Sequence, residues 1–223
     1  MPLVYQQNIN ATTKIGVWHI AEAEDFFLQQ VPLQRNITHW HKRLQHLAGR
    51  LLLKELYPEF PLGEILIADT KKPFLESDQW HFSISHSGDY AAAIVSKEWR
   101  VGVDVELLSQ KIGEIRHKFL GEEEQLEVGS WKLVGGWQES KMINYQYSMF
   151  NVQLLTLCWS VKESVYKWWG SGGVDFKRDI IIKSVSGDAD QGIVHCDFKN
   201  DTSLNVHFLH FNDNYLTWVV TEH

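Results

Sequence analysis

The sequence predicts an α+β fold of two lobes of similar size, residues 1–105 and 106–223. Each half contains at least one helical pattern and several short segments that alternate like strands. The connections between successive strands are too short for a crossover helix, which favours antiparallel pairing. The chain of 223 residues is long enough for two small domains or one large one.

In the first half, the segment KIGVWHI alternates like a strand, and AEAEDFFLQQ is typical of a helix. The clearest helix runs from about Thr38 to Leu56, where apolar residues recur at helical spacing and form one face: Trp40, Leu44, Leu47 and Leu51. The opposite face is basic: His39, Arg43, His46, Arg50 and Lys54. A solvated surface explains this basic face as well as a binding surface does.

Three strands follow, at about Trp80–Ser85, Tyr90–Ser96 and Arg100–Glu106. The short connections HSGD and KEW favour an antiparallel meander. In such a meander, His86 would lie at the same end of the sheet as Asp104 and Glu106.

The second half begins with an acidic helical stretch, IGEIRHKFLGEEEQLE. An irregular segment from about Val128 to Phe150 follows, and its aromatic residues form either a contact surface or a local core, with packing slightly favoured: Trp131, Trp137, Tyr145, Tyr147 and Phe150. A strong helix then runs from about Leu154 to Trp169 and ends at GSGG. The remaining segments predict four β-strands: DIIIKSV, GIVHCDF, LNVHFLHF and YLTWVVTE.

The charge and composition exclude several classes of protein. The formal net charge is −7 and the pI about 5.9, which argues against a nucleic acid as the main partner. A local basic patch could still bind a phosphorylated small molecule or an acidic protein. Cys158 and Cys196 show neither a disulfide framework nor zinc-ligand spacing. With no signal-peptide pattern and no membrane-spanning run, we expect a cytoplasmic protein that does not use a membrane.

Two acidic residues lie at the end of the predicted strand at about Arg100–Glu106. Because side chains alternate across a strand, Asp104 and Glu106 share a face with Gly102, and the two carboxylates lie about 7 Å apart. Like charges at that distance repel unless a cation lies between them, and the glycine leaves room for a ligand. The alternative is a polar strand face turned to water.

The late helix adds a third acid. Glu163 shares one face with Ser160 and Lys167, whereas the apolar stripe contains Cys158, Val161, Val165 and Trp168. This pattern makes Cys158 a packed core residue, not a nucleophile. Three carboxylates with a histidine and a lysine nearby suit Mg²⁺ and a diphosphate. The alternative for Glu163 and Lys167 is a weak surface ion pair.

Three segments, FSISHSGDYAAAIV, VGVDVE and WSVKESVYKWWGSGG, resemble the signature blocks of the 4′-phosphopantetheinyl transferases of the long, surfactin-synthetase-activating type. The order of the blocks agrees, and FLGEEE, KKPF and LAGRLLLKEL also fit. The resemblance covers roughly residues 40 to 180. The segment from Val128 to Phe150 matches no pattern of the family, which leaves carrier specificity open.

The resemblance implies a pseudo-dimer of two similar lobes with the active site in the cleft between them. It implies Mg²⁺-dependent transfer of 4′-phosphopantetheine from coenzyme A to a serine of an apo acyl or peptidyl carrier protein, with release of adenosine 3′,5′-bisphosphate. Whether the carrier serves fatty acid, polyketide or nonribosomal peptide synthesis stays open, as does Mn²⁺ in place of Mg²⁺. The two internal lobes favour a monomer.

The resemblance also assigns roles to residues. Asp104, Glu106 and Glu163 would hold the metal, and Glu163 is the candidate base. Ser85 and His86 would contact the phosphates of coenzyme A, and Lys167 would stabilise the diphosphate. The nucleotide end would be bound by the following basic residues: Lys72, Arg43, His46 and Arg50.

Two other functions remain open: a Mg²⁺-dependent phosphohydrolase that uses the same acids, and a non-catalytic module that binds coenzyme A or a carrier. A metal pair at His39 and His41 is disfavoured, because residues two apart on a helix diverge. His207 and His210 fall on opposite faces of a strand and are expected to be structural.

Overall fold

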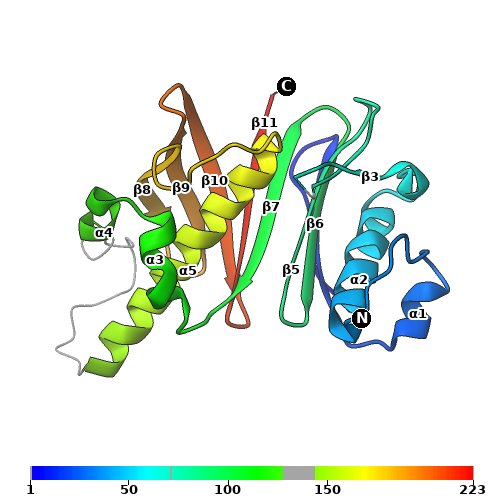
Figure 1. Cartoon of the computed structure of the whole chain (residues 1–223), viewed down its shortest axis with the longest axis horizontal. Coiled ribbons are helices and arrows are strands. Elements are labelled where there is room, and N and C mark those ends of the chain that lie inside the picture. The colour runs from blue at the N-terminus through cyan, green and yellow to red at the C-terminus, as the bar shows by residue number, and fades with distance from the viewer. Residues whose placement is uncertain (1, 71, 128–143, 223) are drawn as a thin grey trace. The chain divides into compact units, whose positions relative to one another are not determined.

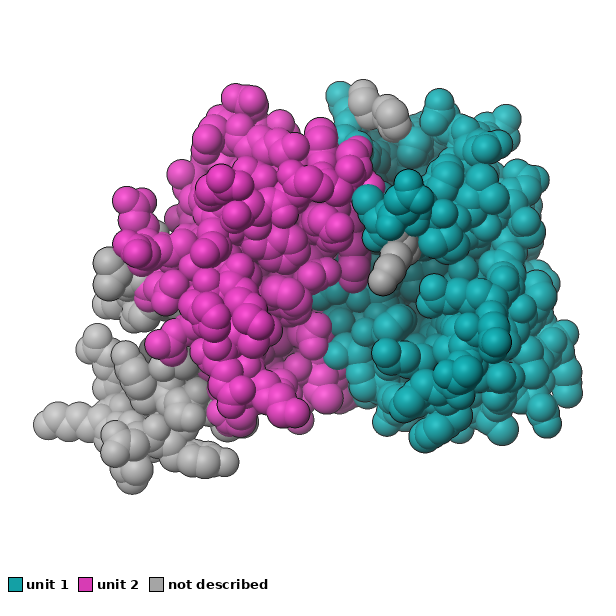
Figure 2. Space-filling view, in the orientation of Figure 1, with its two compact units in different colours: residues 1–105, 220–223 teal, residues 106–219 magenta. Residues whose placement is uncertain are grey.

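The computed structural model describes residues 2–70, 72–127 and 144–222 of the chain. The described chain forms two compact units, residues 1–105 with 220–223, and residues 106–219 (Figure 2). Both contain helices and antiparallel strands, so the predicted α+β class is confirmed. The strand β7 (Arg100–Leu107) carries the chain from the first unit into the second, with the division between Val105 and Glu106.

The sheet of unit 1 has the strand order β1-β2-β6-β5, and all neighbours are antiparallel. The strands are β1 (Leu3–Asn8), β2 (Thr13–His19), β5 (His81–Ser87) and β6 (Tyr90–Ser96). The predicted hairpin of β5 and β6 is confirmed, but the predicted meander is wrong because β2, not β7, lies beside β6. Two short strands, β3 (Leu66–Ile67) and β4 (Pro73–Phe74), pair separately.

One long helix, α2 (Trp40–Leu56), covers this sheet and packs on β2 and β6 (Figure 1). Its apolar face joins the core of unit 1, as predicted for Leu44, Leu47 and Leu51. Gly49 lets the helix approach β5 closely, since a Cβ there would lie 2.7 Å from Cγ2 of Ile84. The unit also contains α1 (Glu24–Leu28) and the 3₁₀ turn η1 (Leu62–Glu64).

The two faces predicted for this helix need correction. Trp40, expected on the buried face, is the first residue of the helix and is 66% exposed. His46 and Arg50, expected on a surface face, are each only 6% exposed. The apolar stripe is therefore shorter than the helix, and part of the basic face is buried.

Unit 2 consists of a helical segment followed by an antiparallel meander in the order β8-β9-β10-β11. The four strand patterns at the end of the sequence are confirmed. The elements are α3 (Ile112–Phe119), α4 (Glu122–Glu127), α5 (Asn144–Trp169), β8 (Ile180–Gly187), β9 (Gln191–Phe198), β10 (Thr202–Phe211) and β11 (Asn214–Thr221).

Helix α5 is longer than predicted. It begins at Asn144, about ten residues before the predicted start, so the last part of the segment predicted to be irregular is helical. Trp131 and Trp137 lie outside the described residues, as do the side chains of Tyr145, Tyr147 and Phe150. The helix ends at Trp169, where Gly170 has a positive φ of 74°, as the GSGG pattern predicted.

The core of unit 2 forms between α5 and the sheet (Figure 1). The predicted apolar stripe of α5 lies in this core: Cys158, Val161, Val165 and Trp168. Cys158 is 1% exposed, and burial raises the pKa of its thiol to about 12, so it is a core residue as predicted. In the part of the chain that the structure describes, no helix is long and apolar enough to cross a membrane.

Candidate functional site

The strand β7 carries Asp104, which is a buried residue. The residue is 3% exposed, and its carboxylate accepts a hydrogen bond from Ser85 Oγ at 2.7 Å. At the preceding residue of β7, the Val103 N–H donates a hydrogen bond to Ser83 Oγ at 3.2 Å. Side chains of β5 therefore fix the position of β7, and Ser85 lies against Asp104 even though the predicted meander, which contained both strands, does not form.

The other two acids belong to unit 2. Glu106 follows the division between the units and is half-buried. Glu163 and Lys167 are half-buried residues of α5. Their predicted neighbour on this face, Ser160, is buried and bonded to Thr217 of β11: Thr217 Oγ1 donates to the Ser160 carbonyl at 2.9 Å, and the two hydroxyl oxygens are 3.0 Å apart.

The three acids fit a hard cation by their chemistry. Asp104, Glu106 and Glu163 supply only carboxylate oxygens, the ligand type that Mg²⁺ prefers. Within residues 2–70, 72–127 and 144–222, no group of three or more His, Cys, Asp or Glu side chains forms a ready-made metal site. A bound Mg²⁺ would therefore need additional oxygen ligands, and phosphate and water oxygens commonly fill this role.

A second group of polar residues in unit 1, here called the basic cluster, contains Arg35, His46, Arg50 and His86. His46 and Arg50 of α2 are both buried, and Arg50 Nη1 donates to His46 Nδ1 at 3.1 Å. Arg50 Nε donates to Gln34 Oε1 at 2.8 Å. Because arginine can only donate, Nδ1 of His46 is the acceptor, and the proton of the neutral ring is on Nε2.

The electrostatics of the basic cluster favour an anion. Burial, followed by the charges of Arg50, Arg35 and His86, lowers the pKa of His46 to about 3. Burial and then Arg35 lower the pKa of Arg50 to about 10, so the guanidinium stays charged at neutral pH. The Nε2 atom of His46 is buried and has no hydrogen-bond partner among the described residues. A buried N–H without an acceptor is costly, and an anionic ligand would satisfy it.

The remaining predicted basic residues have different surroundings. Arg43 is turned toward α1, where it forms an ion pair with Glu24, and Nε donates to Oε1 at 2.8 Å. Lys72 is half-buried, and burial, followed by the charge of Arg100, lowers its pKa to about 8. Arg35 and Arg100 were not predicted, because no periodic pattern connects either residue to the basic helix face.

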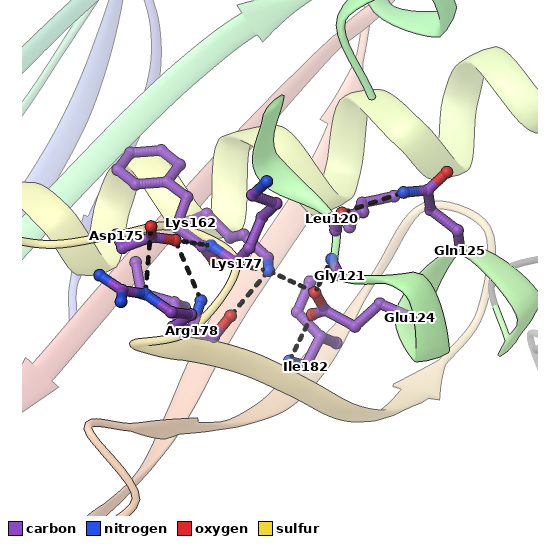
Figure 3. A network of polar contacts seen from close by, with 11 residues as sticks. Leu120, Gly121, Glu124, Gln125, Lys162, Asp175, Lys177, Arg178 and Ile182 are labelled. Carbon is purple, nitrogen blue, oxygen red and sulfur yellow. Dashed lines mark hydrogen bonds and ion pairs between the residues drawn. The ribbon is translucent and has the colours of Figure 1, made fainter. Parts of the chain in front are cut away.

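A third group of polar residues lies in unit 2 and was also missed by the sequence analysis (Figure 3). Lys162 is fully buried, and its Nζ donates to Glu124 Oε2 at 2.8 Å, to the Phe176 carbonyl at 2.9 Å and to the Ile180 carbonyl at 2.7 Å. Glu124 also accepts the N–H groups of Gly121 and Ile182, each at 2.9 Å. These groups are called the Lys162 network below.

One sequence signal could have found Lys162. It is four residues after Cys158 and three before Val165, so it shares the apolar side of α5 and must be buried. No such signal exists for Glu124, which is one of three consecutive glutamates. Burial lowers the pKa of Lys162, and the adjacent Glu124 carboxylate opposes this effect.

Comparison with known proteins gives a family match. Residues 100–220, more than half of the chain, match the family described as the 4'-phosphopantetheinyl transferase superfamily. The chain is 41% identical to the 4'-phosphopantetheinyl transferase AcpT of Escherichia coli O157:H7 over 69 residues, which are 30% of this chain and 34% of that protein. It is 31% identical to AcpT of Salmonella typhi over 96 residues, 43% of this chain and 46% of that protein.

A longer match is to the L-aminoadipate-semialdehyde dehydrogenase-phosphopantetheinyl transferase of Pongo abelii. The two are 30% identical over 145 residues, which cover 59% of this chain and 44% of that protein. The chain thus spans between a third and a half of the length of these relatives.

Proposed function

The chain belongs to the 4′-phosphopantetheinyl transferase superfamily, and on this premise we propose that it moves the phosphopantetheine group of coenzyme A onto a serine of an apo acyl or peptidyl carrier protein. The observation that carries the proposal is that the family match includes β7 and α5, and with them Asp104, Glu106, Glu163 and Lys167. The surfactin-synthetase-activating type, and the two units as similar lobes of a pseudo-dimer, residues 1–105 and 106–223, are part of the same proposal.

The proposed metal ligands are three carboxylates. Asp104 would contribute from unit 1, and Glu106 and Glu163 from unit 2. Bound Mg²⁺, or Mn²⁺ in its place, would neutralise and orient the diphosphate of coenzyme A. Ser85 holds Asp104 by its hydrogen bond and so fixes the direction of one proposed ligand.

Coenzyme A would bind with its anionic groups at the basic residues of unit 1. The basic cluster supports this assignment because it combines the buried guanidinium of Arg50 with the buried Nε2–H of His46. We assign His86 and Ser85 to the phosphates, and His46 and Arg50 to the nucleotide end. Lys72 remains part of this proposal. Arg43 can take part only if a ligand competes with Glu24 for its guanidinium.

The reaction would be a direct displacement. The carrier serine Oγ forms a bond to the β-phosphorus of coenzyme A, and the bond from that phosphorus to the bridging oxygen breaks. Adenosine 3′,5′-bisphosphate leaves with the bridging oxygen and the bonding electrons. Glu163 accepts the serine proton, while Lys167 and His86 stabilise the negative charge that develops on the leaving phosphate.

The test is a transfer assay read by mass. The protein is incubated with coenzyme A, Mg²⁺ and a panel of apo carrier proteins, and a carrier that gains the mass of the phosphopantetheine group establishes the reaction. We expect Asp104→Asn and Glu163→Gln to abolish transfer, whereas Glu114→Gln, on an exposed position of α3, should leave it unchanged. Full turnover by Asp104→Asn or Glu163→Gln would refute the assignment of these residues.

The same assay separates the other candidate functions. Adenosine bisphosphate released without a carrier would indicate a phosphohydrolase. Coenzyme A binding without any product would indicate a binding module. The proposal takes the active protein to be a monomer, which light scattering during size-exclusion chromatography tests.

A further inference from the structure

The Lys162 network lies next to the proposed active-site face of α5. Lys162 and Glu163 are consecutive, so their side chains leave the helix about 100° apart. Lys162 points into the interior of unit 2 and is 0% exposed, whereas Glu163 is half-buried. Because both belong to one rigid helical turn, the contacts of Lys162 determine the direction in which Glu163 points.

The network uses the whole hydrogen-bonding capacity of the lysine. An ammonium group has three donors, and Lys162 directs them to three acceptors at 2.7–2.9 Å. Glu124 accepts from Lys162 and from two backbone N–H groups. The network therefore joins α5 to the segment before α4, to the loop at Phe176 and to the start of β8 (Figure 3).

A second contact holds the same part of α5. Ser160, two residues before Lys162, is bonded to Thr217 of β11 through both its carbonyl and its hydroxyl group. The two contacts lie on different sides of the helix, since residues two apart are about 200° apart around its axis. Together they restrict both rotation and sliding of the turn that contains Glu163.

Stability alone is a weak reason for such a network. Apolar residues of similar volume often stabilise a core as well as a buried ion pair does, because burial removes both charges from water. A charged pair with saturated hydrogen bonds, in contrast, allows only one geometry. The gain from the Lys162 network is therefore a fixed position of α5.

We propose that Lys162 and Glu124 are positioning residues for the phosphopantetheinyl transfer, because they fix the rotation and axial position of the α5 turn that carries Glu163 and Lys167. This inference rests on the proposed function. Neither residue would touch substrate. Both would act through Glu163, in the way that second-shell partners act on metal ligands.

The first test variant is Glu124→Asp, which keeps the charge of the pair but shortens the carboxylate side chain by one methylene. We expect kcat to fall by about 10- to 100-fold and the KM for coenzyme A to change less than about twofold. Binding of Mn²⁺ in the presence of coenzyme A, followed by the electron paramagnetic resonance signal of the free ion, should weaken by about 10- to 100-fold.

The matched control is Val194→Ala, a core substitution in β9 of the same unit. It should lower the Tm by at least as much as Glu124→Asp does, yet leave kcat and Mn²⁺ binding near those of the parent chain. A purely structural role for the Lys162 network predicts that both variants lose activity only in proportion to the fraction unfolded.

The double variant Lys162→Met/Glu124→Gln provides a second test in case a single variant does not fold. It removes both charges together and should have a higher Tm than Lys162→Met alone, while kcat stays at least tenfold below that of the parent chain. Parental kcat and Mn²⁺ binding in a folded Glu124→Asp or double variant would overturn the inference and leave the proposed function intact. A parent chain that neither transfers the group nor binds Mn²⁺ would overturn both.

Discussion

The Lys162 network and the basic cluster differ in how fully their polar atoms are hydrogen-bonded. In the Lys162 network of unit 2, every donor of the lysine has an acceptor, and one positive charge faces one negative charge. In the basic cluster of unit 1, cationic groups lie near one another, and Nε2 of His46 has no partner among the described residues. His46 and Arg50 are buried like Lys162 and Glu124, so the difference between these two pairs is not one of exposure.

This difference separates a structural arrangement from a binding arrangement. A saturated and neutral network is complete without any other molecule, and its value lies in the geometry that it fixes. A buried N–H without an acceptor beside arginine destabilises the free protein, and an anionic ligand would remove that penalty. We therefore expect substitutions in the Lys162 network to reduce stability, and substitutions in the basic cluster to reduce ligand affinity.

The largest effect is expected for Glu124→Ala. This substitution leaves the Lys162 ammonium buried without its counter-charge and removes the acceptor of the Gly121 and Ile182 N–H groups. The free energy of unfolding should fall by about 3–5 kcal/mol. Urea unfolding followed by tryptophan fluorescence measures the change.

The control for this prediction is Glu123→Ala, the exposed neighbour in α4. It should change the free energy of unfolding by less than about 0.5 kcal/mol. A loss below about 1 kcal/mol for Glu124→Ala would contradict the contrast between the two polar groups.

The pH dependence of stability tests the basic cluster. The pKa of His46 is about 3 in the folded protein, below the ordinary value of 6.5. Between these values the unfolded chain binds a proton that the folded chain does not, so stability falls as the pH is lowered from 6.5 toward 3. The contribution of His46 should reach about 1.4 kcal/mol per pH unit.

Unfolding experiments between pH 7 and pH 4 on the parent chain and on His46→Gln isolate this contribution. The glutamine variant should lose less stability on acidification than the parent chain. His39→Gln, at an exposed position before α2, should behave like the parent. Equal pH dependence in the parent and in His46→Gln would show that His46 is protonated in the folded protein.

The smallest effect on stability is expected for His46→Leu. It removes both the unsatisfied Nε2–H and the acceptor of Arg50, so the two changes nearly cancel and the free energy of unfolding should change by less than about 1 kcal/mol. The dissociation constant for coenzyme A should rise about tenfold, equivalent to about 1.4 kcal/mol, through the loss of one hydrogen bond. Calorimetric titration measures this affinity, and unchanged binding would remove His46 from the proposed ligand site.

Local patterns in the sequence predicted most of the secondary structure. The four last strands and helix α2 follow from side-chain periodicity, which is a property of neighbouring residues. The burial of Cys158 followed from its place in an apolar stripe of α5. Where breaker residues interrupted the pattern before α5, the first ten residues of the helix were missed.

The sequence also indicated which residues are candidates for the functional site. The segments around Ser85, Asp104 and Glu163 were assigned by their resemblance to family blocks, and two of the three lie within the family match over residues 100–220. The sequence by itself therefore determined the types of the elements, the family, and the acids that the proposal uses.

Only the tertiary structure decided which elements meet. Besides its hairpin partner β5, β6 pairs with β2, more than seventy residues earlier in the chain, and not with the next strand β7. The burial of His46 and Arg50, the exposure of Trp40, and the choice of Glu124 from three adjacent glutamates depend on contacts with distant segments. Periodicity describes a segment by itself, whereas burial and pairing depend on which distant residues pack against it, and that information is not local.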